Sequence, residues 1–393
     1  MTGNGEPGTS AARFQVVMVL AAAILVGCGS GAASSKSSGE TPTTAASTQG
    51  KGNRTPGQPA FSVAANCTEA VSNGKDLLGV ACPGSVSRLD PSSGKPRWTV
   101  SDPSWQQFER IDLGGDVIVA SIKVTVPASG LTAKQEGYRV VAVGDGKKLW
   151  ETKLYPPSPE PTPEFAITAD TVVAQAGSVV NAFDTRSGHQ RFERPVDKTK
   201  CSVTYPPLLF KDSVAACGQR FSLSDGSPLA FRAPRTGLAA DPGSDVAAAQ
   251  LDNGETVFAI IRSDGSPQAS VTGEFLGFAG PSIVFKHDAG RSGKVSGVRP
   301  DGSVLWEQAV SFDTSDGFSD NLSFANGSVW IRNSSNELVA VDGATGKPAS
   351  PIPTTAVGLG KSARVVATTA NVVVVKTGDR DSDNSPSLRA ITR

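Results

Sequence analysis

The chain has 393 residues, and its 37 basic and 37 acidic side chains leave no formal net charge. Nucleic-acid-binding proteins usually carry an excess or a stripe of basic residues, so the balanced charge argues against that class. After the N-terminal segment no apolar run reaches the length of a membrane span, which predicts a mature chain that is soluble apart from any anchor.

The first segment has the features of an export signal. Residues 14–27 form an apolar run that is too short to span a bilayer, and the run ends at Leu25-Val26-Gly27-Cys28. This tetrapeptide resembles the lipobox of bacterial lipoproteins, in which the cysteine receives the lipid. The resemblance implies a signal peptide over 1–27, lipid attachment with palmitate-type chains at Cys28, and a place on the extracytoplasmic face of the cell membrane. An uncleaved anchor helix is the alternative.

Residues 28–59 contain no aromatic and no large aliphatic side chain. Such a segment cannot bury enough apolar surface to offset the entropy lost on ordering, so we expect a flexible, lipid-anchored stalk. The domain that follows, residues 60–393, is larger than the usual single core unless its architecture is repetitive.

A hairpin pattern recurs seven times in this domain. Each copy has an apolar strand, an acidic turn that ends in glycine, and a short strand that often carries an aromatic residue four positions after the glycine. The turn glycines are Gly94, Gly146, Gly188, Gly226, Gly265, Gly302 and Gly346, spaced by 37 to 52 residues. This period is typical of four-stranded propeller blades. A run rich in small and β-branched apolar residues precedes each hairpin, as expected of a central strand buried on both faces.

An eighth central run begins at Ala370, and only one further strand, from Ser387, follows it. An open last blade would leave an unpaired edge in the ring. The remaining β-like segment, residues 60–64, is therefore predicted to complete the eighth blade. The fold prediction is an all-β, eight-bladed β-propeller of four-stranded antiparallel blades, with a seven-bladed ring as the alternative.

The first turn, with Asp90, Gly94, Lys95 and Trp98, resembles the D-x-x-x-G-K-x-x-W turn of pyrroloquinoline-quinone-type (PQQ-like) repeat propellers. The resemblance covers about residues 60–393, although the other copies are degenerate. In that family the aromatic residues dock one blade on the next. This implies packing roles, not ligand contacts, for Trp98, Trp150, Phe192 and Trp306.

Four cysteines remain in the propeller region. Cys67 and Cys82 are 15 positions apart, Cys201 and Cys217 are 16 apart, and the second member of each pair ends the strand before a turn hairpin. An even number of cysteines in an exported chain favours disulfides. We therefore predict the disulfide bonds Cys67–Cys82 and Cys201–Cys217.

The sequence offers little catalytic chemistry. Quinone-dependent enzymes of the resembled family typically use an adjacent Cys-Cys pair, Ca²⁺ ligands and an aspartate base, and the chain has no Cys-Cys dipeptide. Neither of its two histidines stands beside a nucleophile signature. No catalytic residue and no cofactor are predicted, and a quinone-dependent dehydrogenase ranks third among the functions considered.

One acidic loop is a candidate Ca²⁺ site. Asp379, Asp381 and Asp383 alternate like the first ligands of a calcium loop, but the later glycine and bidentate acid of such loops are missing. A solvated loop of mixed charge is the alternative.

The function predicted from these features is a non-enzymatic, membrane-tethered scaffold for protein binding in the cell envelope, with an envelope protein as partner. The architecture is similar to that of the propeller lipoprotein of bacterial outer-membrane protein assembly, although fold similarity alone does not transfer a role. The richness in Ala, Gly, Val and Thr indicates a high-GC, actinobacterial genome. A ligand- or metal-binding envelope sensor is the alternative function.

Overall fold

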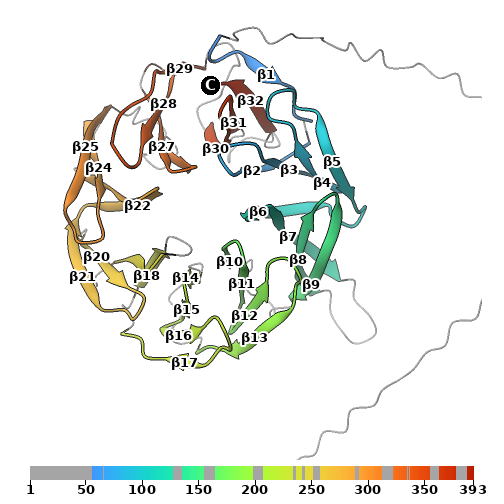
Figure 1. Cartoon of the computed structure of the whole chain (residues 1–393), viewed down its shortest axis with the longest axis vertical. Coiled ribbons are helices and arrows are strands. Elements are labelled where there is room, and N and C mark those ends of the chain that lie inside the picture. The colour runs from blue at the N-terminus through green and yellow to red at the C-terminus, as the bar shows by residue number, and fades with distance from the viewer. Residues whose placement is uncertain are drawn as a thin grey trace, which may run out of the picture. The chain divides into compact units, whose positions relative to one another are not determined.

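The computed structural model describes residues 55–393 except 65, 127–134, 155–163, 198–206, 233–235, 241–243, 251–256, 288–291, 312–321, 334, 336, 355–362 and 378–386. In this part of the chain, eight four-stranded antiparallel sheets stand in a ring (Figure 1). The prediction of an eight-bladed propeller is confirmed. Over the same residues, the structure has no helix long and apolar enough to cross a membrane.

The first strand of each blade lies nearest the centre of the ring, and the second strand lies on the outer side of the first (Figure 1). The first strands are β2 (Glu69–Ser72), β6 (Gln107–Gly114), β10 (Glu164–Ile167), β14 (Leu208–Leu209), β18 (Thr236–Ala240), β22 (Glu274–Ala279), β26 (Leu322–Ala325) and β30 (Arg364–Thr368). The second strands are β3 (Leu78–Cys82), β7 (Val117–Val126), β11 (Thr171–Ala176), β15 (Ser213–Ala216), β19 (Val246–Gln250), β23 (Ser282–His287), β27 (Ser328–Arg332) and β31 (Val372–Thr377).

The third and fourth strands form the hairpins that the repeat predicts. The third strands are β4 (Ser85–Leu89), β8 (Gln135–Gly144), β12 (Val179–Asp184), β16 (Gln219–Ser222), β20 (Val257–Arg262), β24 (Ser292–Val298), β28 (Glu337–Asp342) and β32 (Ser387–Thr392). The outer strands are β5 (Pro96–Ser101), β9 (Lys147–Leu154), β13 (Gln190–Pro195), β17 (Pro228–Leu229), β21 (Pro267–Thr272), β25 (Val304–Ser311), β29 (Ile352–Pro353) and β1 (Pro59–Phe61).

The core lies between neighbouring blades, where the second strands are buried on both faces. In β11, Val172, Val173 and Ala174 are fully buried, although successive side chains of a strand point to opposite faces. One face of β11 packs on the blade before it and the other on the blade after it. This explains why the central strands are continuous apolar runs rather than alternating ones.

Strand β1 closes the ring by pairing with β32 at the other end of the chain. Pro59 lies opposite Ile391, and Phe61 lies opposite Ala390. The closing strand is shorter than the predicted segment 60–64 and begins one residue earlier. Beyond Phe61 the chain turns toward the first blade, and the carbonyl of Ala64 accepts a hydrogen bond of 3.0 Å from the amide of Cys67.

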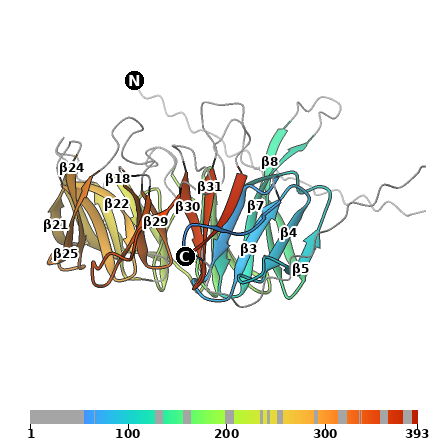
Figure 2. The ribbon, with the colours of Figure 1, turned by 90° about the horizontal axis from the view of Figure 1, so that it is seen from above.

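The two sides of the ring carry different connections. Because successive strands of a blade are antiparallel, the turns joining first to second and third to fourth strands lie on one side. The connections between second and third strands, and those between blades, lie on the other. Strands β7 and β8, with ten residues each, rise beyond their neighbours on this second side (Figure 2).

Candidate functional site

The aromatic residues that follow the turn glycines lie between blades, each against the turn glycine of the next blade. A Cβ atom on Gly188 would come within 2.3 Å of Trp150 Cγ. The indole Nε1 of Trp150 also donates a hydrogen bond of 2.8 Å to the carbonyl of Thr185 in the next blade. The pairs are Trp98 with Gly146, Trp150 with Gly188, Phe192 with Gly226 and Trp306 with Gly346. These side chains hold blades together and do not line the cavity described below.

The sequence analysis missed one further contact between an aromatic residue and a turn glycine. Phe61 of β1 packs on Gly94 of the first blade, where a Cβ would lie 2.4 Å from Phe61 Cδ2. Phe61 stands four residues after Gly57, which has a positive φ of 83° and lies against the carbonyl of Pro353 in the seventh blade. The repeated glycine-plus-four spacing therefore exists in the eighth blade too, and it was the signal that could have revealed this pair.

The turn aspartates cap backbone amides. Asp184 Oδ1 accepts hydrogen bonds from the amides of Ser187 at 2.8 Å and Arg186 at 3.2 Å. The Ser187 hydroxyl also donates a hydrogen bond of 2.8 Å to Oδ1. The bonds from the amide and hydroxyl of Ser187, with a further bond from Arg191, lower the pKa of Asp184 to about 2. Hydrogen bonds that stabilise the charged form of a carboxylate have this effect. These bonds give Asp184 a structural role in the turn.

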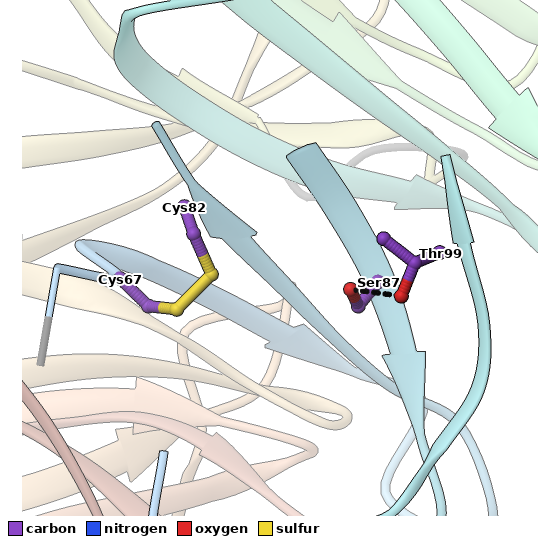
Figure 3. Close-up of a disulfide and its surroundings, with 4 residues drawn as sticks. All are labelled: Cys67, Cys82, Ser87 and Thr99. Atoms are coloured by element: carbon purple, nitrogen blue, oxygen red, sulfur yellow. Dashed lines mark hydrogen bonds between the residues drawn. A yellow bond between two sulfur atoms is a disulfide. The ribbon is translucent and has the colours of Figure 1, made fainter. Parts of the chain in front are cut away.

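The disulfide Cys67–Cys82 ties the entry of the innermost strand β2 to the end of β3 (Figure 3). In the same blade, a hydrogen bond of 2.8 Å between the hydroxyls of Ser87 and Thr99 joins β4 to β5. Cys217 is also disulfide-bonded. Cys201 lies outside the described residues, so its pairing with Cys217 stays a prediction, as does lipid attachment at Cys28.

A cavity of about 500 Å³ lies at the centre of the ring, where its two ends meet. Its walls come from four innermost strands: β2 and β6 of the first two blades, and β26 and β30 of the last two. Half-buried apolar side chains of Val71, Phe324 and Val366 form part of the wall. Val366 lies at an irregularity in the pairing of β30 with β31, and such bulges redirect side chains.

The two acidic side chains in the cavity lining are each held by a cation. Glu69 forms an ion pair with Lys376 of the last blade, and both side chains are more than four-fifths buried. Asp112 accepts a hydrogen bond of 3.1 Å from Arg110 within β6. The Arg110 guanidinium also lies 4.8 Å from the ring centroid of Phe165 in the third blade.

A polar cluster joins three blades beside the cavity. The amide nitrogen Nδ2 of Asn326 lies 2.9 Å from Ser72 Oγ and 2.6 Å from the carbonyl oxygen of Thr368. Ser72 Oγ in turn accepts a hydrogen bond of 3.0 Å from the amide of Thr368. The seventh, eighth and first blades are thereby linked by side chains as well as by β1.

Arg364, the first residue of β30, is the remaining charged residue of the cavity lining and is exposed. Across the described residues, its guanidinium has no hydrogen-bond or ion-pair partner. The sequence analysis singled out none of these lining residues, because it recognised the hairpins and the central strands but not the short innermost strands.

Over the residues that the structure describes, no group of three or more His, Cys, Asp or Glu side chains could hold a metal ion. The candidate Ca²⁺ ligands Asp379, Asp381 and Asp383 lie outside those residues and stay a prediction. His189 is exposed in a turn, and His287 forms a hydrogen bond with Ser296 on the neighbouring strand.

A family model described as "Outer membrane protein assembly factor BamB" matches the chain twice, over residues 35–266 and 83–384. The two overlapping matches together span most of the chain, as expected for a repeat. No curated protein matches the chain significantly.

Two solved structures align with the chain at low identity. BamB from Moraxella catarrhalis is 16% identical, with 72% of this chain and 83% of that chain covered and a TM-score of 0.41. Hsv2 from Kluyvelomyces marxianus is 9% identical, with 80% and 89% covered and a TM-score of 0.42. Similarity at this level carries no argument about function.

Proposed function

The chain belongs to the family of the outer membrane protein assembly factor BamB, and on this premise we propose that it is a non-enzymatic scaffold for protein binding in the cell envelope. The match of the family model over most of the chain carries the proposal. An assembly factor acts by binding other proteins, and a propeller offers two broad faces for this purpose. On one of them β7 and β8 project beyond the neighbouring strands (Figure 2).

The proposal includes a tether on the extracytoplasmic face of the membrane. The lipobox at Cys28 and the apolar run before it support lipid attachment there. The chain from Cys28 would reach the propeller at β1, the strand that closes the ring.

The non-enzymatic part of the proposal is supported by how the acidic groups are used. In the cavity lining, Glu69 and Asp112 are each held by a cation, and in the turns Asp184 caps amides. A general base needs a carboxylate free to take a proton from a substrate.

Two experiments in cells test the scaffold. Cys28→Ala should move the protein from the detergent-extracted membrane fraction to the soluble fraction, and fatty-acid labelling that persists in this variant would refute the tether. Chemical crosslinking of cells, followed by purification through a tag within residues 29–54, should recover the same envelope proteins with the native chain repeatedly. Their absence from every preparation would refute the scaffold.

A ligand-binding sensor is the second candidate, because the ring holds a cavity of about 500 Å³. An enzyme dependent on pyrroloquinoline quinone is the third. A ligand that binds only the native state raises the melting temperature. Adding the quinone with Ca²⁺ to the purified chain should leave the melting temperature unchanged, and a clear rise with reduction of a dye by an alcohol would favour the dehydrogenase.

A further inference from the structure

The innermost strands around the central cavity expose backbone groups to it as well as side chains. Strands β2, β6, β26 and β30 are each the first strand of their sheet and pair with a neighbour on one edge only. The other edge carries N–H and C=O groups that the sheet does not use. On β30, side chains of the neighbouring blades already bond the amides of Val365 and Thr368, so the remaining groups of the four edges are the ones that a ligand can bind. An extended peptide can bind such an edge through its own backbone, which is the basis of β-strand addition.

The charges of the cavity favour a negative occupant. Glu69 is compensated by Lys376 and Asp112 by Arg110, whereas Arg364 has no partner in the described part of the chain. An arginine forms two parallel hydrogen bonds with a carboxylate, and this geometry makes the recognition selective. The unpaired guanidinium therefore complements an Asp or Glu side chain.

The apolar part of the cavity wall sets a second requirement for the bound ligand. Val71, Phe324 and Val366 are half-buried at the cavity surface, so they can gain burial when an apolar group covers them. The volume of about 500 Å³ falls within the range of sites that enclose drug-sized ligands, and a short peptide segment has that bulk.

We propose that this cavity binds an extended segment of a partner protein, with an acidic side chain on Arg364 and apolar side chains on Val71, Phe324 and Val366. The inference rests on the proposed scaffold function and names the chemistry of its partner. The segment would contact the first two and the last two blades together, so its binding also ties the ends of the propeller.

The test uses the full mature chain in detergent and a phage-displayed library of random heptapeptides. Selected peptides should be enriched in Asp or Glu flanked by apolar residues. Their affinity, measured by fluorescence anisotropy, should fall at least about tenfold with Arg364→Ala, because a charge-assisted hydrogen bond is lost. Replacing the peptide's acid by its amide should have the same effect. Val366→Trp, which fills the cavity, should also weaken binding.

The matched control is Arg262→Ala. Arg262 is also exposed and without a side-chain partner among the described residues, but it lies on β20 of the fifth blade and outside the cavity lining. Its substitution should leave the affinity unchanged. Circular dichroism and the melting temperature show that each variant is folded, which we expect because the exposed Arg364 side chain has no hydrogen-bond or ion-pair partner within the described ranges.

Three results with the peptides would overturn the inference: no acidic enrichment, equal affinity of the selected peptides for Arg364→Ala, or complete displacement by succinate at the concentration at which the peptide itself competes. The last result would make the site one for small carboxylates. The proposed function is judged separately. If envelope proteins crosslink equally to the native chain and to Arg364→Glu, the proposed scaffold function is retained, but the cavity is refuted as the site that binds them.

Discussion

The amide of Gly57 donates a hydrogen bond of 2.9 Å to the carbonyl of Thr392, so the two ends of the propeller meet within one turn. The amide of Thr392 also donates a bond of 2.9 Å to the carbonyl of Gln58. In the first blade, Gly94 and Asp90 make the same two bonds within a continuous turn, the second to the carbonyl of Lys95, each at 2.8 Å. The eighth blade therefore rebuilds the repeated turn from two chain ends.

This arrangement predicts where truncation becomes costly. Deleting residues 29–54 from the mature chain should leave the melting temperature unchanged. Deleting 29–61 removes Gly57 and the whole of β1, exposes the edge of β32 and uncovers Gly94, so the melting temperature should fall by about 5 °C or more. Differential scanning calorimetry measures both variants. Equal melting temperatures would show that β1 does not close the ring.

The docking of Trp150 on Gly188 predicts unequal effects for two glycine substitutions at similar backbone angles. Gly188 and Gly115 have φ values of 70° and 65°, so alanine costs about 1–2 kcal/mol of backbone strain at either position. A Cβ at Gly115 meets nothing closer than 3.8 Å, whereas one at Gly188 would overlap Trp150.

Gly188→Ala should therefore lower the free energy of unfolding by a further ~1–3 kcal/mol, the usual range for overpacking. Urea unfolding of both variants measures the difference. Equal losses would mean that the indole moves aside at no cost and that this contact does not hold the blades together.

The disulfide Cys67–Cys82 should stabilise the propeller by about 3 kcal/mol, because it closes a loop of 15 residues. The double variant Cys67→Ser/Cys82→Ser should lose that amount in urea unfolding. Reduction should destabilise a Cys201→Ser/Cys217→Ser background but not a chain lacking all four cysteines. Non-reducing peptide mapping should find Cys201 joined to Cys217, and a link from Cys67 to Cys201 would contradict both pairings.

The turn aspartate Asp184 predicts a contribution to acid stability. Its pKa is lowered from 3.8 to about 2 in the folded chain, so the folded state holds its proton less tightly than the unfolded state. The stabilisation is complete above pH ~4–5 and is lost as the pH falls through about 2.

Asp184→Asn should therefore lower the free energy of unfolding near pH 6, and its difference from the native chain should shrink toward pH 2. Asp245→Asn, which replaces an exposed acid before β19, is the control and should change stability little at either pH. A difference for Asp184→Asn that stays constant from pH 6 to pH 2 would assign the effect to lost packing and not to charge.

The sequence by itself determined the repeat, and it predicted eight blades, with seven as the alternative, together with the region of the closing strand. The turn glycines and apolar central strands are local patterns, because a positive φ and burial on both faces restrict the residue types at each position. The residues between Gly57 and Phe61 carry the same spacing, but they stand so far from the other strands of their blade that the pattern was recognised only in part.

Only the tertiary structure decided what the centre of the ring contains. Glu69 and Lys376 are 307 positions apart in the chain, and their neighbours follow no repeated pattern. Apart from β6, the innermost strands have two to six residues, and most of them mix polar with apolar side chains, so they show no continuous apolar run in the sequence. How the first and last blades meet when the ring closes decides which charges are paired there, and it leaves Arg364 without a partner among the residues that the structure describes.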